Sequence, residues 1–194
     1  MNLREKNAVL SFTPEDQKLI NLDQMLERHK EIIVAAQSNQ ALLEHSIQFA
    51  MRSLGKKNPY LQGIKLWKKG EVAEERMGRV RSLIKQMVRD WSSEGAEERA
   101  TCYDRVIRAV EERFPDHEKR HDVHILVPGV GLARLAWEYM NRGFSVVANE
   151  HDLSMIAVAN FMLNSKLKIN EISIFPFITE RLNCWSFKDR MREI

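Results

Sequence analysis

The sequence is short of cysteine, of long apolar runs and of blocks of charge of one sign. Its 194 residues include two cysteines, Cys102 and Cys184, which are too few and too far apart to indicate a disulfide framework. No segment approaches the roughly 20 apolar residues that a membrane-spanning helix needs, and the N-terminus lacks the apolar core of a secretion signal. These absences predict that the protein does not associate with a membrane and works in a reducing compartment, the cytoplasm, the nucleus or both.

The charges are mixed along the chain rather than gathered. There are 30 Lys and Arg against 27 Asp and Glu, a net charge of +3, and the two signs are interleaved in residues 74–81 and 97–99. A nucleic-acid-binding surface usually concentrates Lys and Arg on one face or in one segment. We therefore expect no nucleic-acid partner.

Three histidines lie close together in the sequence: His117, His121 and His124. They stand among lysines and arginines, and no pattern of cysteines or acids completes the four ligands of a zinc site. We expect a polar connecting segment here and no metal site.

Helical patterns fill the first part of the chain. Thr13 and Pro14 form a helix start, and apolar residues continue at helical spacing to Ile33. A second helix is predicted over residues 40–54, ending at Gly55, followed by a loop over residues 55–70. The third helix has the clearest apolar stripe: Val80, Leu83, Ile84, Met87, Val88 and Trp91. A fourth helix is predicted to have an apolar side formed by Cys102, Tyr103, Val106, Ile107, Val110 and Phe114.

The pattern changes to strand, helix and strand between residues 125 and 150. An apolar run enters a turn with Gly129, Gly131 and Ala133, a helix follows over residues 132–141, and a second strand over residues 144–149 ends at Glu150. Glycines let the main chain approach a ligand closely, a helix N-terminus offers free N–H groups, and an acid about 20 residues further on can accept from ribose hydroxyls. A helix after Asp152 and a third strand or extended loop over residues 172–178 complete the predicted α/β unit.

This order of elements leaves several interpretations open. A glycine turn alone is also typical of a tight connection between a strand and a packed helix, but the second strand and its terminal acid favour a nucleotide-type site. Dinucleotide-dependent oxidoreductases and S-adenosylmethionine-dependent methyltransferases both use this architecture. The spacing does not separate these two classes of enzyme.

The residues around the turn resemble the carnosine N-methyltransferase family. The resemblance is carried by VPGVGLARLAWE at residues 127–138, NE at 149–150, NFMLN at 160–164 and, upstream, IKQMVRDWSSEG at 84–95, and it covers residues 80–194. It implies an N-terminal helical region, residues 1–118, and a partial Rossmann-like S-adenosylmethionine-dependent methyltransferase domain, residues 119–194, cut off after its first half. The implied activity is transfer of a methyl group from S-adenosyl-L-methionine to the imidazole of carnosine, giving anserine.

The same resemblance implies four cofactor-binding residues. Gly129 is expected beneath the methionine portion of the cofactor, Glu150 at the ribose hydroxyls, and Gln86 and Arg89 on the cofactor from the preceding helix. From the pattern alone, Gln86 and Arg89 lie opposite the apolar stripe and predict a solvated face. The resemblance assigns no catalytic or carnosine-binding residue to this chain, since those parts of the family lie beyond the second strand.

The chain departs from the family pattern at the turn and after the acid. Ala133 stands where the family usually has glycine, and its methyl group is expected to be tolerated if the backbone there is helical. His151 and Asp152 replace a Trp-Ser pair, and His151 is expected at a loop surface or beside the adenosine.

Two functions therefore remain. In the first, the chain is a truncated enzyme of the family, of impaired activity, that acts on carnosine or a related dipeptide. In the second, it is a non-catalytic helical and half-Rossmann module that binds a partner protein. A second copy of the chain, in a homodimer, is a further partner that the sequence leaves open.

Overall fold

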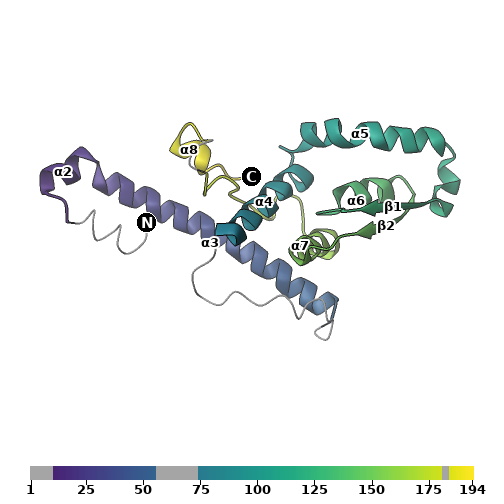
Figure 1. The fold of residues 1–194 in the computed structure, drawn as a ribbon, viewed down its shortest axis with the longest axis horizontal. Helices are drawn as coiled ribbons and strands as arrows, with labels where there is room; N and C mark the ends of the chain where they lie inside the picture. The colour runs from purple at the N-terminus through teal and green to yellow at the C-terminus, as the bar shows by residue number, and fades with distance from the viewer. Residues whose placement is uncertain (1–10, 56–73, 181–183) are drawn as a thin grey trace.

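The computed structural model describes residues 11–55, 74–180 and 184–194. Within these ranges the protein is mainly helical, with one small parallel sheet. Figure 1 shows the long helix α3 crossing the molecule, with α5, α6 and the sheet on the side away from α2. At this coarse level the structure agrees with the expected mixture of helices and parallel strands. No helix in these ranges is long and apolar enough to cross a lipid bilayer.

The N-terminal helices are divided differently from the prediction. Helix α2 is Pro14–Leu19, with Thr13 as its cap, and α3 is one helix of 32 residues, Leu22–Ser53. The sequence predicted a break before residue 40, but the break lies at Asn21, whose backbone is left-handed with a φ of 51°. Helix α3 ends before Gly55, as expected. The loop predicted over residues 55–70 lies, beyond Gly55, outside the described residues.

A distant contact accounts for the continuity of α3 at the predicted break. Asn39 is buried, and its side-chain amide donates to Phe175 O and accepts from Phe175 N, at 2.9 Å in each case. Asparagine is a poor helix former because its side chain competes for main-chain hydrogen bonds. Here a distant segment of main chain satisfies that side chain, so the helix continues through it.

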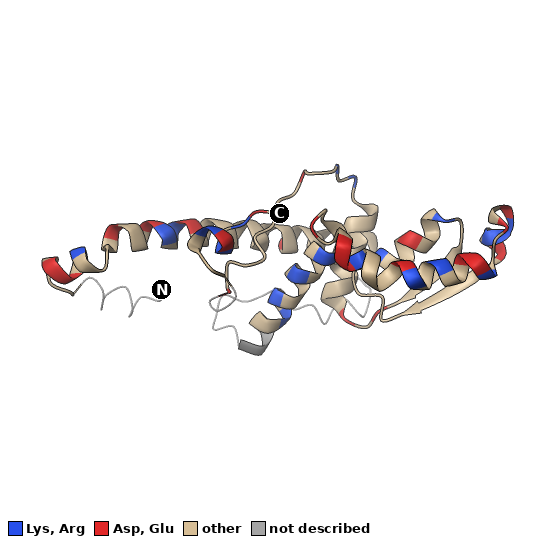
Figure 2. Cartoon of the chain, turned by 90° about the horizontal axis from the view of Figure 1, so that it is seen from above, with Lys and Arg blue, Asp and Glu red and all other residues tan. Residues whose placement is uncertain are grey.

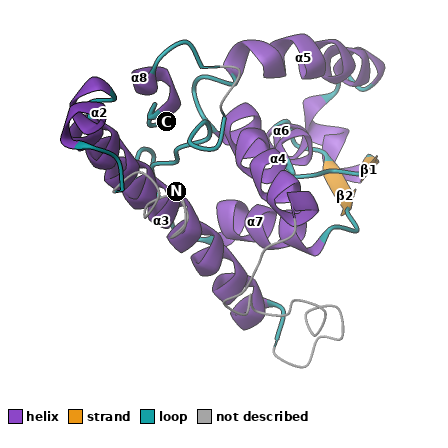
Figure 3. Cartoon of the chain, turned by 60° about the vertical axis from the view of Figure 1, so that its left-hand side comes forward, coloured by secondary structure: helices purple, strands orange, loops and turns teal. Residues whose placement is uncertain are grey.

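Helix α4, Glu74–Trp91, confirms the predicted third helix and its stripe. Leu83, Ile84 and Met87 are buried, and the other three stripe residues pack half-buried beside them. The stripe meets Leu42 of α3 and residues of α7, Leu153–Asn164, in the first hydrophobic core. Figure 3 shows α7 beside α3 and α4.

Helix α5, Ala96–Arg113, buries less of its apolar side than predicted. Ile107 is 3% exposed, but Val106 is 48% exposed and Cys102 is also exposed. A narrow row of residues on α5, which includes Ile107, packs against a second core that contains Val127, Tyr139 and Phe144. The prediction is therefore wrong at Cys102 and Val106, which are exposed. Figure 2 shows charges of both signs along α5.

The sheet consists of two parallel strands, β1 (His124–Pro128) and β2 (Ser145–Asn149), joined by α6, Arg134–Asn141. The 3-10 helix η2, His117–Asp122, leads into β1. One face of the sheet packs in the second core, whereas Leu126 and Val147, paired on the other face, are 64% and 57% exposed. Parallel sheets are normally covered on both faces, so this face is open in the described part of the chain.

The segment after α7 is an extended loop, one of the two forms predicted for it. Ile174 exchanges two main-chain hydrogen bonds of 2.9 Å with Ile194. A short helix, α8 (Phe187–Arg190), lies between them in the chain. The described C-terminal residues therefore fold back onto the loop and the first core.

Candidate functional site

The turn between β1 and α6 has a left-handed backbone at every second residue. The φ angles are 61° at Gly129, 58° at Gly131 and 64° at Ala133. Val130 N donates to Asn149 O at 3.0 Å, which ties the turn to the end of β2. A side chain added at Gly129 would meet no atom within 4 Å, so the main chain there borders open space.

Ala133 does not have the helical backbone on which its tolerance was expected to depend. It is the N-cap of α6, which begins at Arg134 rather than at the predicted Leu132, and it is 5% exposed. A left-handed conformation costs an L-residue about 1–2 kcal/mol, a cost that glycine avoids. The methyl group is therefore held in a strained position.

Replacing Ala133 by glycine is expected to leave the free energy of unfolding within about 0.5 kcal/mol of the parent value or to raise it, because relief of strain offsets the lost methyl group. Ala136, equally buried but inside α6, is the matched control. Ala136→Gly is expected to lower the free energy of unfolding by about 1.5 kcal/mol, through lost burial and helix propensity. Urea denaturation of both variants measures the difference, and equal losses would contradict the strained backbone.

Glu150 closes the turn through its carboxylate. Its Oε2 accepts from Gly131 N at 2.9 Å, and its Oε1 accepts from His151 N at 2.8 Å and Asp152 N at 3.0 Å. The side chain is 10% exposed. These main-chain N–H groups, that of Asp152 first, lower the pKa of Glu150, so the group is ionised at neutral pH. A carboxylate has about four acceptor positions, and Oε2 therefore keeps one for a further donor.

Helix α4 brings Gln86 to the same turn. Gln86 Oε1 lies 3.4 Å from the position that a side chain on Gly131 would take, and Gln86 Nε2 donates to Ser82 Oγ at 3.3 Å. Gln86 and Arg89 are half-buried, so the face that the pattern alone predicted to be solvated is partly covered. The reason is that the glycine turn packs beside this face of α4, which periodicity along one helix does not reveal.

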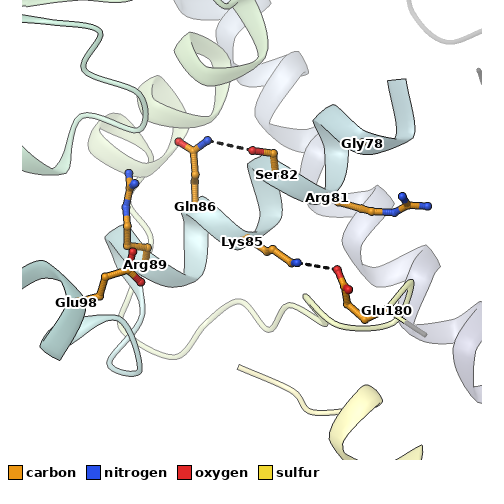
Figure 4. Close-up of a pocket in the computed structure, with 8 residues that line it drawn as sticks. All are labelled: Gly78, Arg81, Ser82, Lys85, Gln86, Arg89, Glu98 and Glu180. Carbon is orange, nitrogen blue, oxygen red and sulfur yellow. Dashed lines mark hydrogen bonds and ion pairs between the residues drawn. The ribbon is translucent and has the colours of Figure 1, made fainter. Parts of the chain in front are cut away.

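Gln86 and Arg89 line an open pocket of about 420 Å³ (Figure 4). Its wall is polar and charged: Lys85 of α4 pairs with Glu180 at 2.6 Å, and Glu98 of α5 lies beside Arg89. Gly129 and Glu150 do not line this pocket, but Gln86 connects it to Gly131 and hence to Glu150. The predicted site residues thus lie in two adjoining places, the glycine turn and the pocket along α4.

Two hydrogen bonds hold the end of α4 against the glycine turn. Trp91 Nε1 donates to Leu132 O at 3.0 Å, and Arg134 Nη1 donates to Asp90 O at 2.9 Å. The Arg134 guanidinium also lies over the rings of Trp137 and Trp91, 4.6 and 5.2 Å from their centroids. Sequence reasoning missed the two hydrogen bonds because they join residues more than 40 positions apart.

Sequence reasoning also missed Asp90, which is 1% exposed and forms an ion pair with Arg89 at 2.7 Å. Asp90 lies three residues after Met87, at the edge of the apolar stripe. A buried carboxylate needs partners, so an acid at the edge of a buried stripe is an unusual placement. This placement was the signal in the sequence that could have identified Asp90.

The residues that follow Glu150 have separate roles. The side chain of His151 is 98% exposed, at the loop surface. Asp152 caps α7, accepting from Ser154 N at 2.8 Å and Met155 N at 3.3 Å, which agrees with the predicted helix start. In residues 11–55, 74–180 and 184–194, no three His, Cys, Asp or Glu are grouped so as to hold a metal ion.

A family model described as carnosine N-methyltransferase matches residues 67–194, more than half of the chain. The chain belongs to the carnosine N-methyltransferase family. Its relatives include the carnosine N-methyltransferase of Mus musculus, 40% identical over 121 residues, and that of Schizosaccharomyces pombe, 36% identical over 119 residues. Each alignment takes in 61% of this chain, but 30% of the mouse protein and 32% of the yeast protein.

The chain thus spans about a third of the length of the carnosine N-methyltransferases that it matches. The carnosine N-methyltransferase of Dictyostelium discoideum is 35% identical over 120 residues, which are 61% of this chain and 26% of that protein. A mainly helical fold with a small parallel sheet is consistent with part of a methyltransferase domain.

Proposed function

We propose that this chain supplies the first half of the cofactor site of an S-adenosylmethionine-dependent enzyme that methylates the imidazole of carnosine to give anserine. In this proposal residues 1–118 are the helical region and residues 119–194 are part of a Rossmann-like methyltransferase domain. The observation that carries the proposal is that Gln86 of α4 lies beside Gly131 of the glycine turn and that Glu150, the residue after β2, accepts a hydrogen bond from Gly131.

The residues present are suited to S-adenosylmethionine. The open space beside Gly129 accommodates a close approach to the main chain, and Glu150 Oε2 keeps an acceptor position for a ribose hydroxyl. A guanidinium has five N–H donors, and the pair with Asp90 uses the Nε and Nη2 of Arg89. The remaining donors suit the carboxylate of a methionine moiety through charge-assisted hydrogen bonds.

The role of these residues is to bind and orient. S-adenosylmethionine, when bound, would supply an electrophilic methyl group on its sulfonium. Arg89 would hold the carboxylate of its amino-acid portion and Glu150 its ribose, with the glycine turn beneath them. Fixing both portions would reduce the entropic cost of reaching the reactive geometry. We assign no residue of this chain to carnosine.

Calorimetric titration of the chain with S-adenosylmethionine tests the proposal. We expect saturable binding, no binding of NAD, and a loss of affinity of about tenfold or more for Arg89→Ala, since a charge-assisted pair is removed. Arg108→Ala, an exposed arginine of α5, is the matched control and should bind as the parent does. A folded parent chain that binds no S-adenosylmethionine would overturn the proposal.

A non-catalytic binding module is the second candidate. The observation in its favour is the open face of the sheet, where Leu126 and Val147 are more than half exposed. Apolar residues paired on a sheet face are suited to contact with another protein. The same titration separates the two candidates, because a module of this kind requires no methyl donor.

A further inference from the structure

Asp90 is a buried acid whose environment points to a specific task. Its carboxylate forms a two-point contact with Arg89, Nε to Oδ1 at 2.7 Å and Nη2 to Oδ2 at 3.0 Å. Tyr103 of α5 donates its hydroxyl to the same Oδ1 at 3.1 Å. Burying a charged acid is costly unless it is paired and hydrogen-bonded, and here both conditions are met.

The guanidinium of Arg89 is consequently held in one orientation. A freely rotating arginine side chain loses rotamer entropy when a ligand fixes it, and a side chain that is already oriented avoids this loss on binding. The hydrogen bond that Arg89 donates to Asp90 raises the pKa of Arg89, so the group stays charged, and its side chain remains 33% exposed at the pocket. Arg89 is therefore both oriented and accessible.

The main chain of the same segment is anchored as well. Arg99 of α5 donates to the carbonyl oxygens of Arg89 and Ser92, and Arg134 of α6 donates to that of Asp90. Two helices thus hold residues 89–92 in place relative to the glycine turn. The orientation imposed by Asp90 is, for that reason, an orientation relative to the cofactor site.

We propose that Asp90, supported by the Tyr103 hydroxyl, is a positioning residue that aligns the guanidinium of Arg89 for the carboxylate of the methionine moiety of S-adenosylmethionine. The inference rests on the proposed function, since it assigns a role within that site. Asp90 itself does not contact the cofactor in this proposal. It acts through Arg89 alone.

The test compares two ligands, of which only one has the amino-acid portion that carries the carboxylate. S-adenosylhomocysteine carries the amino-acid portion, and methylthioadenosine lacks it. We expect Asp90→Asn, which keeps the size of the side chain, to weaken S-adenosylhomocysteine binding about tenfold and to leave methylthioadenosine binding unchanged. Tyr103→Phe should give the same selective effect at about threefold, since it removes one neutral donor from Asp90.

A double-mutant cycle distinguishes a positioning role of Asp90 from a purely structural one, because it measures whether the effect of Asp90 on binding depends on Arg89. In a chain that already carries Arg89→Ala, the further change Asp90→Asn should have no additional effect on S-adenosylhomocysteine binding. Glu111→Gln is the matched control, because Glu111 also pairs with arginines, Arg120 and Arg142, away from the pocket. It should bind both ligands as the parent does.

The outcomes separate the inference from the function on which it rests. If the parent chain binds neither ligand, the proposed function fails and the inference fails with it. If the parent binds S-adenosylhomocysteine but Asp90→Asn and Tyr103→Phe weaken the binding of both ligands equally, the positioning role alone is wrong. The same holds if either change weakens S-adenosylhomocysteine binding as much in the Arg89→Ala chain as in the parent chain. Should Asp90→Asn not fold, the selective effect of Tyr103→Phe, with its melting curve, decides the same question.

Discussion

Replacing Gly95 by alanine is expected to lower the free energy of unfolding by about 3 kcal/mol or more. A side-chain carbon at Gly95 would lie 2.1 Å from Arg89 O and 2.5 Å from Val88 O. Both are main-chain atoms and cannot rotate away, so the junction between α4 and α5 would have to move apart. Urea denaturation followed by circular dichroism measures the loss.

Gly78→Ala is the matched control for this change. Gly78 lies inside α4, and a side-chain carbon there would meet no atom within 4 Å. Alanine is about 1 kcal/mol better than glycine inside a helix, so this variant should be slightly more stable than the parent. Equal stability of the two variants would contradict the close approach of Gly95 to α4.

Because Gly95 lies against the main chain of Arg89, its replacement should also weaken cofactor binding where the variant still folds. The position of the Arg89 guanidinium depends on this junction through Arg99, which donates to the Arg89 carbonyl. A small shift at a binding group is enough to reduce affinity, since charge-assisted pairs depend on geometry. A folded Gly95→Ala chain with parental affinity would show that the junction does not control the pocket.

The second large effect is expected at Glu150. Glu150→Ala removes the acceptor of the main-chain N–H groups of Gly131, His151 and Asp152, and we expect a loss of about 3 kcal/mol in the free energy of unfolding. Binding of S-adenosylmethionine should be lost as well, since the same change removes the proposed ribose acceptor and loosens the turn. Denaturation and calorimetry measure the two effects separately.

The contribution of Glu150 should depend on pH in a definite direction. Its pKa in the folded protein is below the ordinary value of 4.5, so the folded chain binds fewer protons there than the unfolded chain does. The stabilisation is therefore complete above pH 4.5 and is lost as the pH falls through the folded pKa. The difference in stability between the parent and Glu150→Ala should shrink over that acidic range.

Two further variants define the effect of Glu150. Glu150→Gln keeps one acceptor oxygen, so its free energy of unfolding at neutral pH should lie between those of the parent and Glu150→Ala. The contribution of this glutamine should depend little on pH below neutrality, since its amide does not titrate. Glu112→Ala, at an exposed position of α5, should stay within about 0.5 kcal/mol of the parent. If Glu150→Ala were as stable as Glu112→Ala, the carboxylate would not be holding the turn.

Sequence reasoning succeeded where the signal is local. The stripe from Val80 to Trp91 and the succession of strand, glycine turn, helix and strand were predicted because each follows from spacing within about 20 residues. The cap at Asp152 and the end of α3 before Gly55 are local in the same sense. The four proposed cofactor-binding residues came from resemblance to a family and stay a prediction.

Sequence reasoning failed where a contact joins distant segments. Helix α3 runs through Asn39 because Phe175 satisfies that side chain, and the predicted apolar side of α5 is exposed at Val106 because only part of the helix meets the core. Neither partner is visible in the periodicity of a single helix. The left-handed backbone at Ala133 is likewise set by the turn as a whole rather than by the residue.

By itself the sequence determined the class of elements in this protein, the family to which it is similar and the order in which the turn, the helix and Glu150 occur. Only the tertiary structure decided that Gln86 and Arg89 are half-buried beside the turn, that Glu150 is engaged by three main-chain N–H groups, and that buried Asp90 pairs with Arg89. The physical reason is that hydrogen bonds and burial depend on which surfaces meet in space. Spacing along the chain encodes the faces of each element, whereas packing alone selects the partner of each face.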